Sequence, residues 1–150
     1  PEQMARQEKE ADIGRSGTFA VPVSAAELVK RLSRGLCIRP ESIRVAACGN
    51  GGTEPVEQRF QKAGLCTGAG ADLLPMAAEL GCDVFVTGDV KYHEAQEADA
   101  LGICLIDAGH YGTEKLFGQT MQGLLAPKLS GQVEVLVSDV DLDPFQLGTI

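Results

Sequence analysis

Residues 66–116 read CTGAGADLLPMAAELGCDVFVTGDVKYHEAQEADALGICLIDAGHYGTEKL. In this stretch short apolar runs alternate with helical patterns, which is typical of βα units. Strands are expected over residues 83–86 and 103–106, and a shorter one is expected to end at Cys66 and Thr67. The runs are apolar throughout, as in parallel strands buried on both faces. The alternation predicts right-handed crossovers and an α/β fold, with a largely parallel or mixed sheet flanked by helices.

Further elements are expected on both sides of this stretch. Ser24 and Glu27 have the spacing of a helix capping box, and Gly35 is expected to end the helix that follows. The remaining expected elements are strands over residues 43–48 and 133–137, a turn at 50–52, and helices over 71–80, 93–102 and 113–125.

The start of the chain sets the expected domain boundary. Residues 1–20 are polar and then rich in glycine and serine, without a clear period, so we expect a partly ordered lead-in. Residues 21–150 are expected to form a single α/β domain, which is an ordinary size for one domain. The chain begins with Pro1, so we expect that it starts within a longer gene product or has lost its start by processing.

Composition argues against several classes of function. The net charge of −8 argues against a nucleic-acid partner, because neutralising phosphates requires clustered Lys and Arg. No run approaches the roughly 18 apolar residues of a membrane helix, and no signal segment is visible. The five cysteines form no CxxC pair, so we expect reduced, mostly buried thiols in a cytoplasmic protein.

Polar residues follow the expected strands. Three successive loops read TGAG, TGDVKYH and DAGHYGTE, and open α/β sheets bind ligands at the carboxyl ends of their strands. Both histidines of the chain lie in these loops. The topology is expected to bring to one edge Thr67, Thr87, Asp89, His93, Asp107, His110 and Glu114.

His110 and Glu114 form the first candidate pair. They are four residues apart, so they project from one face of a helix that has begun by His110. An imidazole nitrogen beside a carboxylate oxygen suits a first-row metal ion. The alternative is that Glu114 favours the positive end of the helix dipole and that His110 is an ordinary loop histidine.

Asp89 and His93 repeat this spacing in the preceding loop. Asp89 could accept a proton, ligate a metal through water, or cap the next helix. Lys91 could neutralise a phosphate or carboxylate, or be solvated. Asp107 could hold His110 as a hydrogen-bond acceptor, or cap its own loop. The TGAG loop offers backbone N–H groups to an anion, but lacks the lysine of a P-loop and the dinucleotide fingerprint.

Two longer segments carry a family resemblance. TGDVKYHEAQEA (87–98) and LIDAGHYGTEKL (105–116) resemble the signature segments of the Ngg-interacting-factor-three-like family, also called GTP cyclohydrolase 1 type 2 homologues. CTGAGADLL (66–74) resembles its glycine-rich loop, and IGRSG (13–17) resembles its G-R-x-G segment. The resemblance implies the C-terminal portion of a two-lobed fold, a toroidal hexamer, and two divalent metal ions per subunit.

The resemblance also implies roles for individual residues. The family's C-terminal ligands, in a G-H-x-x-x-E segment, fall on His110 and Glu114. Asp89 and His93 match positions close to the metals, so catalytic proton transfer is expected of them. The predicted substrate-binding residues are Thr67, Thr87 and Lys91. This chain lacks the adjacent histidines and the aspartate of the family's N-terminal half, so alone it is expected to hold metal weakly or not at all.

The expected function is that of a metal-dependent hydrolase-like protein. Its cofactors would be Zn, Fe or Mn, its substrate a small molecule such as a purine nucleotide, and its assembly a homo-oligomer. An alternative is a non-catalytic metal-binding or scaffold protein that forms rings. A third is a soluble α/β domain whose loop carboxylates only cap helices. No sequence motif separates these alternatives.

Overall fold

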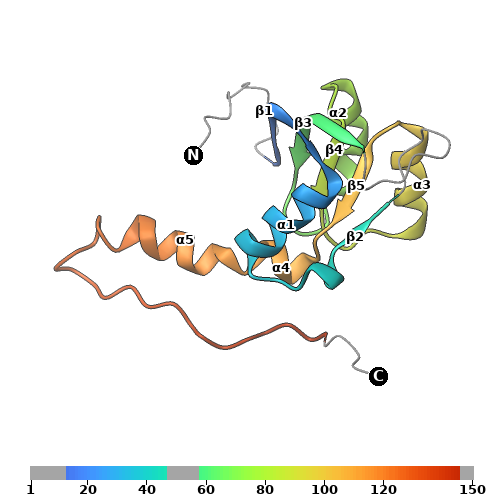
Figure 1. Cartoon of the computed structure of the whole chain (residues 1–150). Helices are drawn as coiled ribbons and strands as arrows, with labels where there is room; N and C mark the ends of the chain where they lie inside the picture. The colour runs from blue at the N-terminus through green and yellow to red at the C-terminus, as the bar shows by residue number, and fades with distance from the viewer. Residues whose placement is uncertain (1–12, 47–57, 146–150) are drawn as a thin grey trace.

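The computed structural model describes residues 13–46 and 58–145 and shows a five-stranded mixed sheet in the order β1-β3-β4-β5-β2 (Figure 1). The three central strands are parallel: β3 (Arg59–Leu65), β4 (Val84–Thr87) and β5 (Cys104–Asp107). Antiparallel strands form the two edges, β1 (Arg15–Ser24) beside β3 and β2 (Arg44–Val45) beside β5. The predicted α/β fold with a mixed sheet is confirmed.

Helices cover both faces of the sheet, because alternate residues of each strand point to opposite sides. On one face Val84 and Ile106 pack with residues of α1 (Ala25–Leu36). On the other, Phe85 and Leu105 pack with residues of α2 (Leu74–Glu79) and α3 (Tyr92–Ala100). Strands β4 and β5 are largely buried on both sides, which explains why residues 84–86 and 104–106 are apolar. Strand β3, in contrast, carries exposed residues at Arg59, Gln61 and Leu65.

The register of the central strands places their carboxyl ends side by side. Leu65 of β3 pairs with Val86 of β4, and Thr87 pairs with Asp107 of β5. The loops that follow these strands therefore leave the sheet at one edge, as the sequence predicted. A 3-10 turn η2 (Ala71–Leu73) leads into α2, and α4 (His110–Glu114) follows the loop after β5.

Helix α1 begins where the sequence predicts but ends later than predicted. Ser24 is the N-cap, and its hydroxyl oxygen accepts a hydrogen bond from the N–H of Glu27 at 3.2 Å, as expected. Gly35, however, lies inside the helix, which continues to Leu36. Cys37 adopts the left-handed conformation there, with φ of 51°, and supplies the turn that was assigned to glycine.

Several other predicted boundaries were wrong. Strand β1 begins at Arg15, so the boundary placed at residue 20 falls within a strand. The helix expected over 113–125 begins at His110 and is divided into α4 and α5 (Leu116–Leu125). Of the strand expected over 43–48, Arg44–Val45 is observed; residues 47 and 48 and the turn at 50–52 lie outside the described residues. Cys66 and Cys82 are buried free thiols, Cys37 is an exposed one, and Cys104 is buried.

Residues 116–145 form what we call the C-terminal arm. It consists of α5 and a segment that runs back beside it, away from the sheet (Figure 1). The strand predicted over 133–137 is not formed, because no neighbouring strand pairs with this segment among the described residues. No residue of α5 is buried. Among the described residues, no helix has both the length and the apolar character that a membrane span requires.

Candidate metal centre

The side chain of His110 lies between two carboxylates. Its Nδ1 is 2.8 Å from Oδ2 of Asp89, and its Nε2 is 3.2 Å from Oε2 of Glu114. His110 is the first residue of α4 and Glu114 the last, so the four-residue spacing places both on one face of the helix, as predicted. All three side chains are about half exposed and open to a ligand from solvent.

The negative charges at this cluster favour the protonated, positively charged form of the His110 imidazole. The hydrogen bond to Asp89 raises the pKa of His110, as do the negative charges of Glu114 and Asp89 and the contact with Glu114; desolvation opposes them. Because a carboxylate only accepts hydrogen bonds, Nδ1 carries a proton when it bonds to Asp89. A cation between Nε2 and the Glu114 oxygen, either a proton or a metal ion, would then stabilise the contact.

The same geometry suits a metal ion. Two ligand atoms about 2.1 Å from a common ion, at an angle of about 90–110°, lie about 3.0–3.4 Å apart. The 3.2 Å separation of His110 Nε2 and Glu114 Oε2 falls in this range. A histidine whose other nitrogen donates to a carboxylate, as His110 does to Asp89, is typical of metal-ligating histidines. The donor set therefore fits a divalent ion.

This cluster supplies only part of a complete site. Within residues 13–46 and 58–145, no group of three or more His, Cys, Asp or Glu side chains is placed to hold a metal ion. His110 and Glu114 are thus two candidate ligands, and Asp89 supports one of them. Protein metal sites usually have at least three protein ligands.

A close backbone contact brings Asp89 and His110 together. A Cβ atom at Gly88 would lie 2.6 Å from the carbonyl carbon of Gly109 and 2.6 Å from the nitrogen of His110, so only glycine fits there. Asp89 has φ of 55°, a left-handed conformation that Asp tolerates better than most residues. Asp89 does not cap α3, whose N-cap is Lys91. Its carboxylate faces His110 instead.

The TGAG loop forms a wall of the cluster. A Cβ atom at Gly68, where φ is +65°, would lie 2.5 Å from Oε1 of Glu114 and 3.2 Å from Nε2 of His110. Thr87 fixes this loop, since its hydroxyl donates to Gly68 O at 2.9 Å and accepts from Gly70 N at 2.8 Å. The hydroxyl of Thr113 accepts from Gly68 N at 2.9 Å. Two of the N–H groups considered for an anion, those of Gly68 and Gly70, are therefore already bound by threonines.

The other predicted site residues lie around this cluster in different environments. Thr87 is fully buried, whereas Thr67 is exposed. Lys91 is exposed and pairs with Glu94, with Nζ 3.2 Å from Oε1. His93 is exposed in the first turn of α3 and makes no hydrogen bond or ion pair with Asp89, His110 or Glu114. The proposed roles of these residues in catalysis and substrate binding stay predictions.

Asp107 takes the second of its two predicted roles. Its carboxylate accepts from Gly109 N at 2.9 Å and so caps its own loop, and it makes no hydrogen bond to His110. It also pairs with Arg44 of β2, which sequence reasoning missed. Arg44 stands 63 positions earlier in the chain, and only the pairing of β2 with β5 reveals it.

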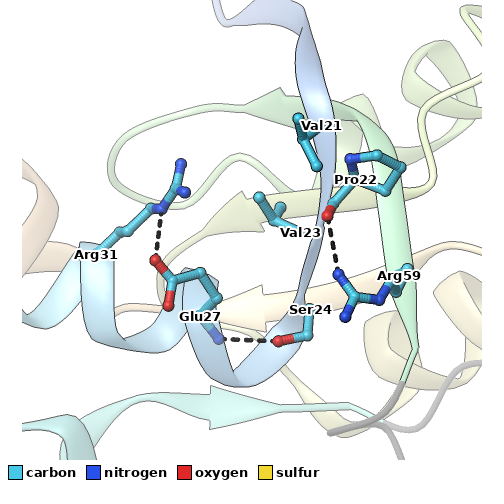
Figure 2. Close-up of a pocket in the computed structure, with 7 residues that line it drawn as sticks. All are labelled: Val21, Pro22, Val23, Ser24, Glu27, Arg31 and Arg59. Atoms are coloured by element: carbon cyan, nitrogen blue, oxygen red, sulfur yellow. Dashed lines mark hydrogen bonds and ion pairs between the residues drawn. The ribbon is translucent and has the colours of Figure 1, made fainter.

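A pocket of about 310 Å³ lies elsewhere, between β1 and the start of α1 (Figure 2). It is lined by Val21, Pro22, Val23, Ser24, Glu27, Arg31 and Arg59. Its polar groups bind one another: Arg31 Nε donates to Glu27 at 3.0 Å, and Arg59 donates to the carbonyl of Pro22 at 3.2 Å. None of the predicted site residues lines it, so the loop cluster remains the candidate site.

Comparison with known proteins agrees with the fold and with the loop motifs. The family model described as Duf34/NIF3 (NGG1p interacting factor 3) matches residues 2–144. The GTP cyclohydrolase 1 type 2 homolog of Listeria innocua is 32% identical over 141 residues, covering 89% of this chain and 34% of that protein. NIF3-like protein 1 of Homo sapiens is 30% identical over 135 residues, covering 90% of this chain and 34% of the human protein.

Solved structures give the same assignment. A Bacillus cereus protein related to NIF3 superposes with a TM-score of 0.77 at 27% identity, covering 90% of this chain and 36% of that one. The chain thus spans about a third of the Listeria and human relatives, and 49% of a Clostridium acetobutylicum homolog. With the family model matching nearly its whole length, the chain belongs to the Duf34/NIF3 family.

Proposed function

We propose that this chain supplies two ligands, His110 and Glu114, to a divalent-metal site in a metal-dependent hydrolase-like protein. The observation that carries the proposal is the position of His110 between two carboxylates, with Nε2 3.2 Å from Glu114 and Nδ1 2.8 Å from Asp89. This arrangement favours a cation beside Nε2. The proton takes this place at low pH, and a metal ion takes it once the imidazole is neutral.

The chain's own residues have separable roles at such a site. Asp89 keeps the proton of His110 on Nδ1, so that the Nε2 lone pair faces Glu114. A bound divalent ion would polarise a substrate oxygen and lower the pKa of a water molecule. Asp89 or His93 would carry a proton, while the exposed Thr67 and Lys91 would contact the substrate. Thr87 would act through the TGAG loop that it holds.

The remaining ligands would come from the part of the relatives that this chain does not span. Two protein ligands bind a metal ion weakly, and the chain covers 34% of the Listeria relative. We infer a centre of two divalent ions, Zn, Fe or Mn, in the longer protein. The name of the relatives, GTP cyclohydrolase 1 type 2 homolog, suggests a purine nucleotide as the first substrate to test.

Metal content tests the ligand assignment. Plasma mass spectrometry would be run on this chain and on a form extended to the length of its relatives, both purified without chelators. We expect metal in the extended form, and its loss in His110→Ala and Glu114→Gln. His93→Ala is the matched control, because His93 is the other histidine and makes no contact with Glu114. Equal loss in His93→Ala, or no metal in either form, would contradict the proposal.

Hydrolysis assays separate an enzyme from a metal-binding scaffold. The extended protein, loaded with metal, would be incubated with GTP and other phosphate compounds. Turnover that disappears in Glu114→Gln while the protein stays folded supports the hydrolase. Metal binding without turnover of any substrate supports the non-catalytic alternative.

The C-terminal arm favours assembly with a second copy of the chain, a property that a ring-forming scaffold needs. Phe117 and Leu136 of the arm are 69% and 76% exposed, and exposed apolar patches of this kind mark association surfaces. Sedimentation velocity is expected to show an oligomer that Phe117→Asp with Leu136→Asp dissociates. Leu101→Asp, at a site 40% exposed outside the arm, is the control. A monomeric wild-type protein would contradict this second candidate.

A further inference from the structure

The carboxylate of Asp107 binds backbone groups of two site loops. It lies at the end of β5, with only 8% of its side chain exposed. Its Oδ1 accepts from the N–H of Gly109 at 2.9 Å, and its Oδ2 accepts from the N–H of Val90 at 3.2 Å. Gly109 belongs to the loop after β5 and Val90 to the loop after β4. One buried side chain therefore joins the two loops.

Arg44 completes this link from the edge strand. It stands opposite Asp107 in the register of β2 and β5, and its guanidinium binds the Asp107 carboxylate through Nε at 3.1 Å and through Nη2. Nη2 also donates to the carbonyl oxygen of Val90 at 2.8 Å. Val90 is thus held on both sides, its N–H by Asp107 and its carbonyl by Arg44.

The bound backbone groups flank the two residues of the histidine–carboxylate contact. Val90 directly follows Asp89, and Gly109 directly precedes His110. Asp89 and Gly109 both have positive φ, at 55° and 79°. For a residue other than glycine, such as Asp89, this conformation persists only where the surroundings fix it. Asp107 binds the backbone of Val90 and Gly109, and Arg44 binds the backbone of Val90. Neither residue makes a hydrogen bond to the His110 side chain.

We propose that Arg44 and Asp107 are positioning residues that set the contact between Asp89 and Nδ1 of His110. Through that contact they decide which nitrogen of His110 carries the proton and which faces Glu114. The metal-related part of this inference rests on the proposed function; the effect on the histidine does not. Removing either residue lets the loop after β4 move away from the loop after β5, and Nδ1 loses its acceptor.

The tautomer of His110 tests this directly by ¹⁵N NMR on the metal-free chain. Spectra would be recorded above the raised pKa of His110, at a pH where its signals no longer change. In the wild type we expect the proton mainly on Nδ1 of His110. In Asp107→Asn and Arg44→Met we expect a shift toward the Nε2–H form. His93 is an internal control, because it makes no hydrogen bond with the cluster.

Matched variants separate positioning from loss of stability. Arg31→Met and Glu27→Gln break an arginine–carboxylate pair of α1 that does not touch the loops, and are expected to leave the His110 spectrum unchanged. The Arg44 side chain is 68% exposed, so Arg44→Met is expected to fold even if Asp107→Asn does not. A wild-type His110 spectrum in folded Arg44→Met, or an equal change at His93, would overturn the proposal.

Co²⁺ titration of the extended protein, followed by its visible absorption, supplies a second readout. Removing outer partners of a metal ligand commonly weakens binding by 10–100-fold, and we expect about tenfold for Arg44→Met. If the tautomer shifts but the wild type binds no Co²⁺, the proposed function fails while the positioning role stands. If the wild type binds Co²⁺ and Arg44→Met changes neither affinity nor tautomer, the positioning role fails.

Discussion

Apolar side chains are mostly buried in strands β4 and β5 of the central sheet and mostly exposed in the C-terminal arm. Val84, Leu105 and Ile106 of the sheet are at most 1% exposed. The arm holds eight of the fifteen large apolar side chains that are exposed in the described part of the chain: Phe117, Leu124, Val133, Leu136, Val137, Val140, Leu142 and Phe145. Apolar sequence alone does not bury a residue; a partner surface is needed. The sheet has helices on both faces, and the site sits on that rigid half.

The largest expected difference is in the stability of two leucine-to-alanine variants, one in the sheet and one in the arm. Leu105→Ala removes a side chain packed in the core and should lower the free energy of unfolding by about 2–5 kcal/mol. Leu136→Ala, at a position 76% exposed, should change it by less than about 0.5 kcal/mol. Urea denaturation of both variants measures the difference. Similar losses at the two positions would show that the arm is packed as firmly as the sheet.

A smaller difference in stability is expected between alanine substitutions of two glycines, one beside the site and one in the arm. Gly68→Ala forces a left-handed alanine, costing about 1–2 kcal/mol, and places a methyl group against Glu114, so divalent-metal binding should be lost. Gly123→Ala in α5 meets no atom within 4 Å and should stabilise the helix by about 0.5–1 kcal/mol. Metal titration of the extended form and circular dichroism of both variants provide the test. Unchanged metal affinity in Gly68→Ala would place the ion away from Glu114.

The smallest expected effects are on pH dependence, with opposite signs in the two regions. The pKa of His110 is raised above 6.5, mainly by its hydrogen bond to Asp89. Its contribution to stability is complete below the ordinary histidine pKa and is lost as pH rises through the raised value. The pKa of Asp141 in the arm is lowered below 3.8, first by the N–H of Asp143 and then by Tyr111. That contribution is present above the ordinary pKa and is lost as pH falls through the lowered one.

Unfolding free energies measured against pH for His110→Gln and Asp141→Asn would check these signs. His110→Gln should remove a dependence near and above neutral pH, and Asp141→Asn one in acid. Both side chains lie near solvent, which screens their interactions, so small amplitudes are expected. A neutral-pH dependence that persists in His110→Gln would assign it to another group.

The sequence predicted the parts of the molecule that depend on local pattern. Apolar runs identified β4 and β5, and the i, i+4 spacing placed His110 and Glu114 on one helix face. The strand expected to end at Cys66 and Thr67 ends at Leu65 instead. The strand expected over 133–137 failed because a strand needs a neighbour, which a local pattern cannot supply. Arg44 was missed because its partner Asp107 is distant in sequence and is reached through an edge strand only two residues long.

The left-handed backbone conformation of Asp89 restricts which residues related proteins can carry at this position. Asp89 takes this conformation directly after Gly88, which lies against the backbone of Gly109. A lineage that abandoned the metal but kept the fold would be free to lose the charge, yet not the conformation. Its residue at this position should drift to Gly or Asn and avoid Val or Ile. Position 89 would thus still carry a residue that tolerates positive φ after the metal ligands had been lost.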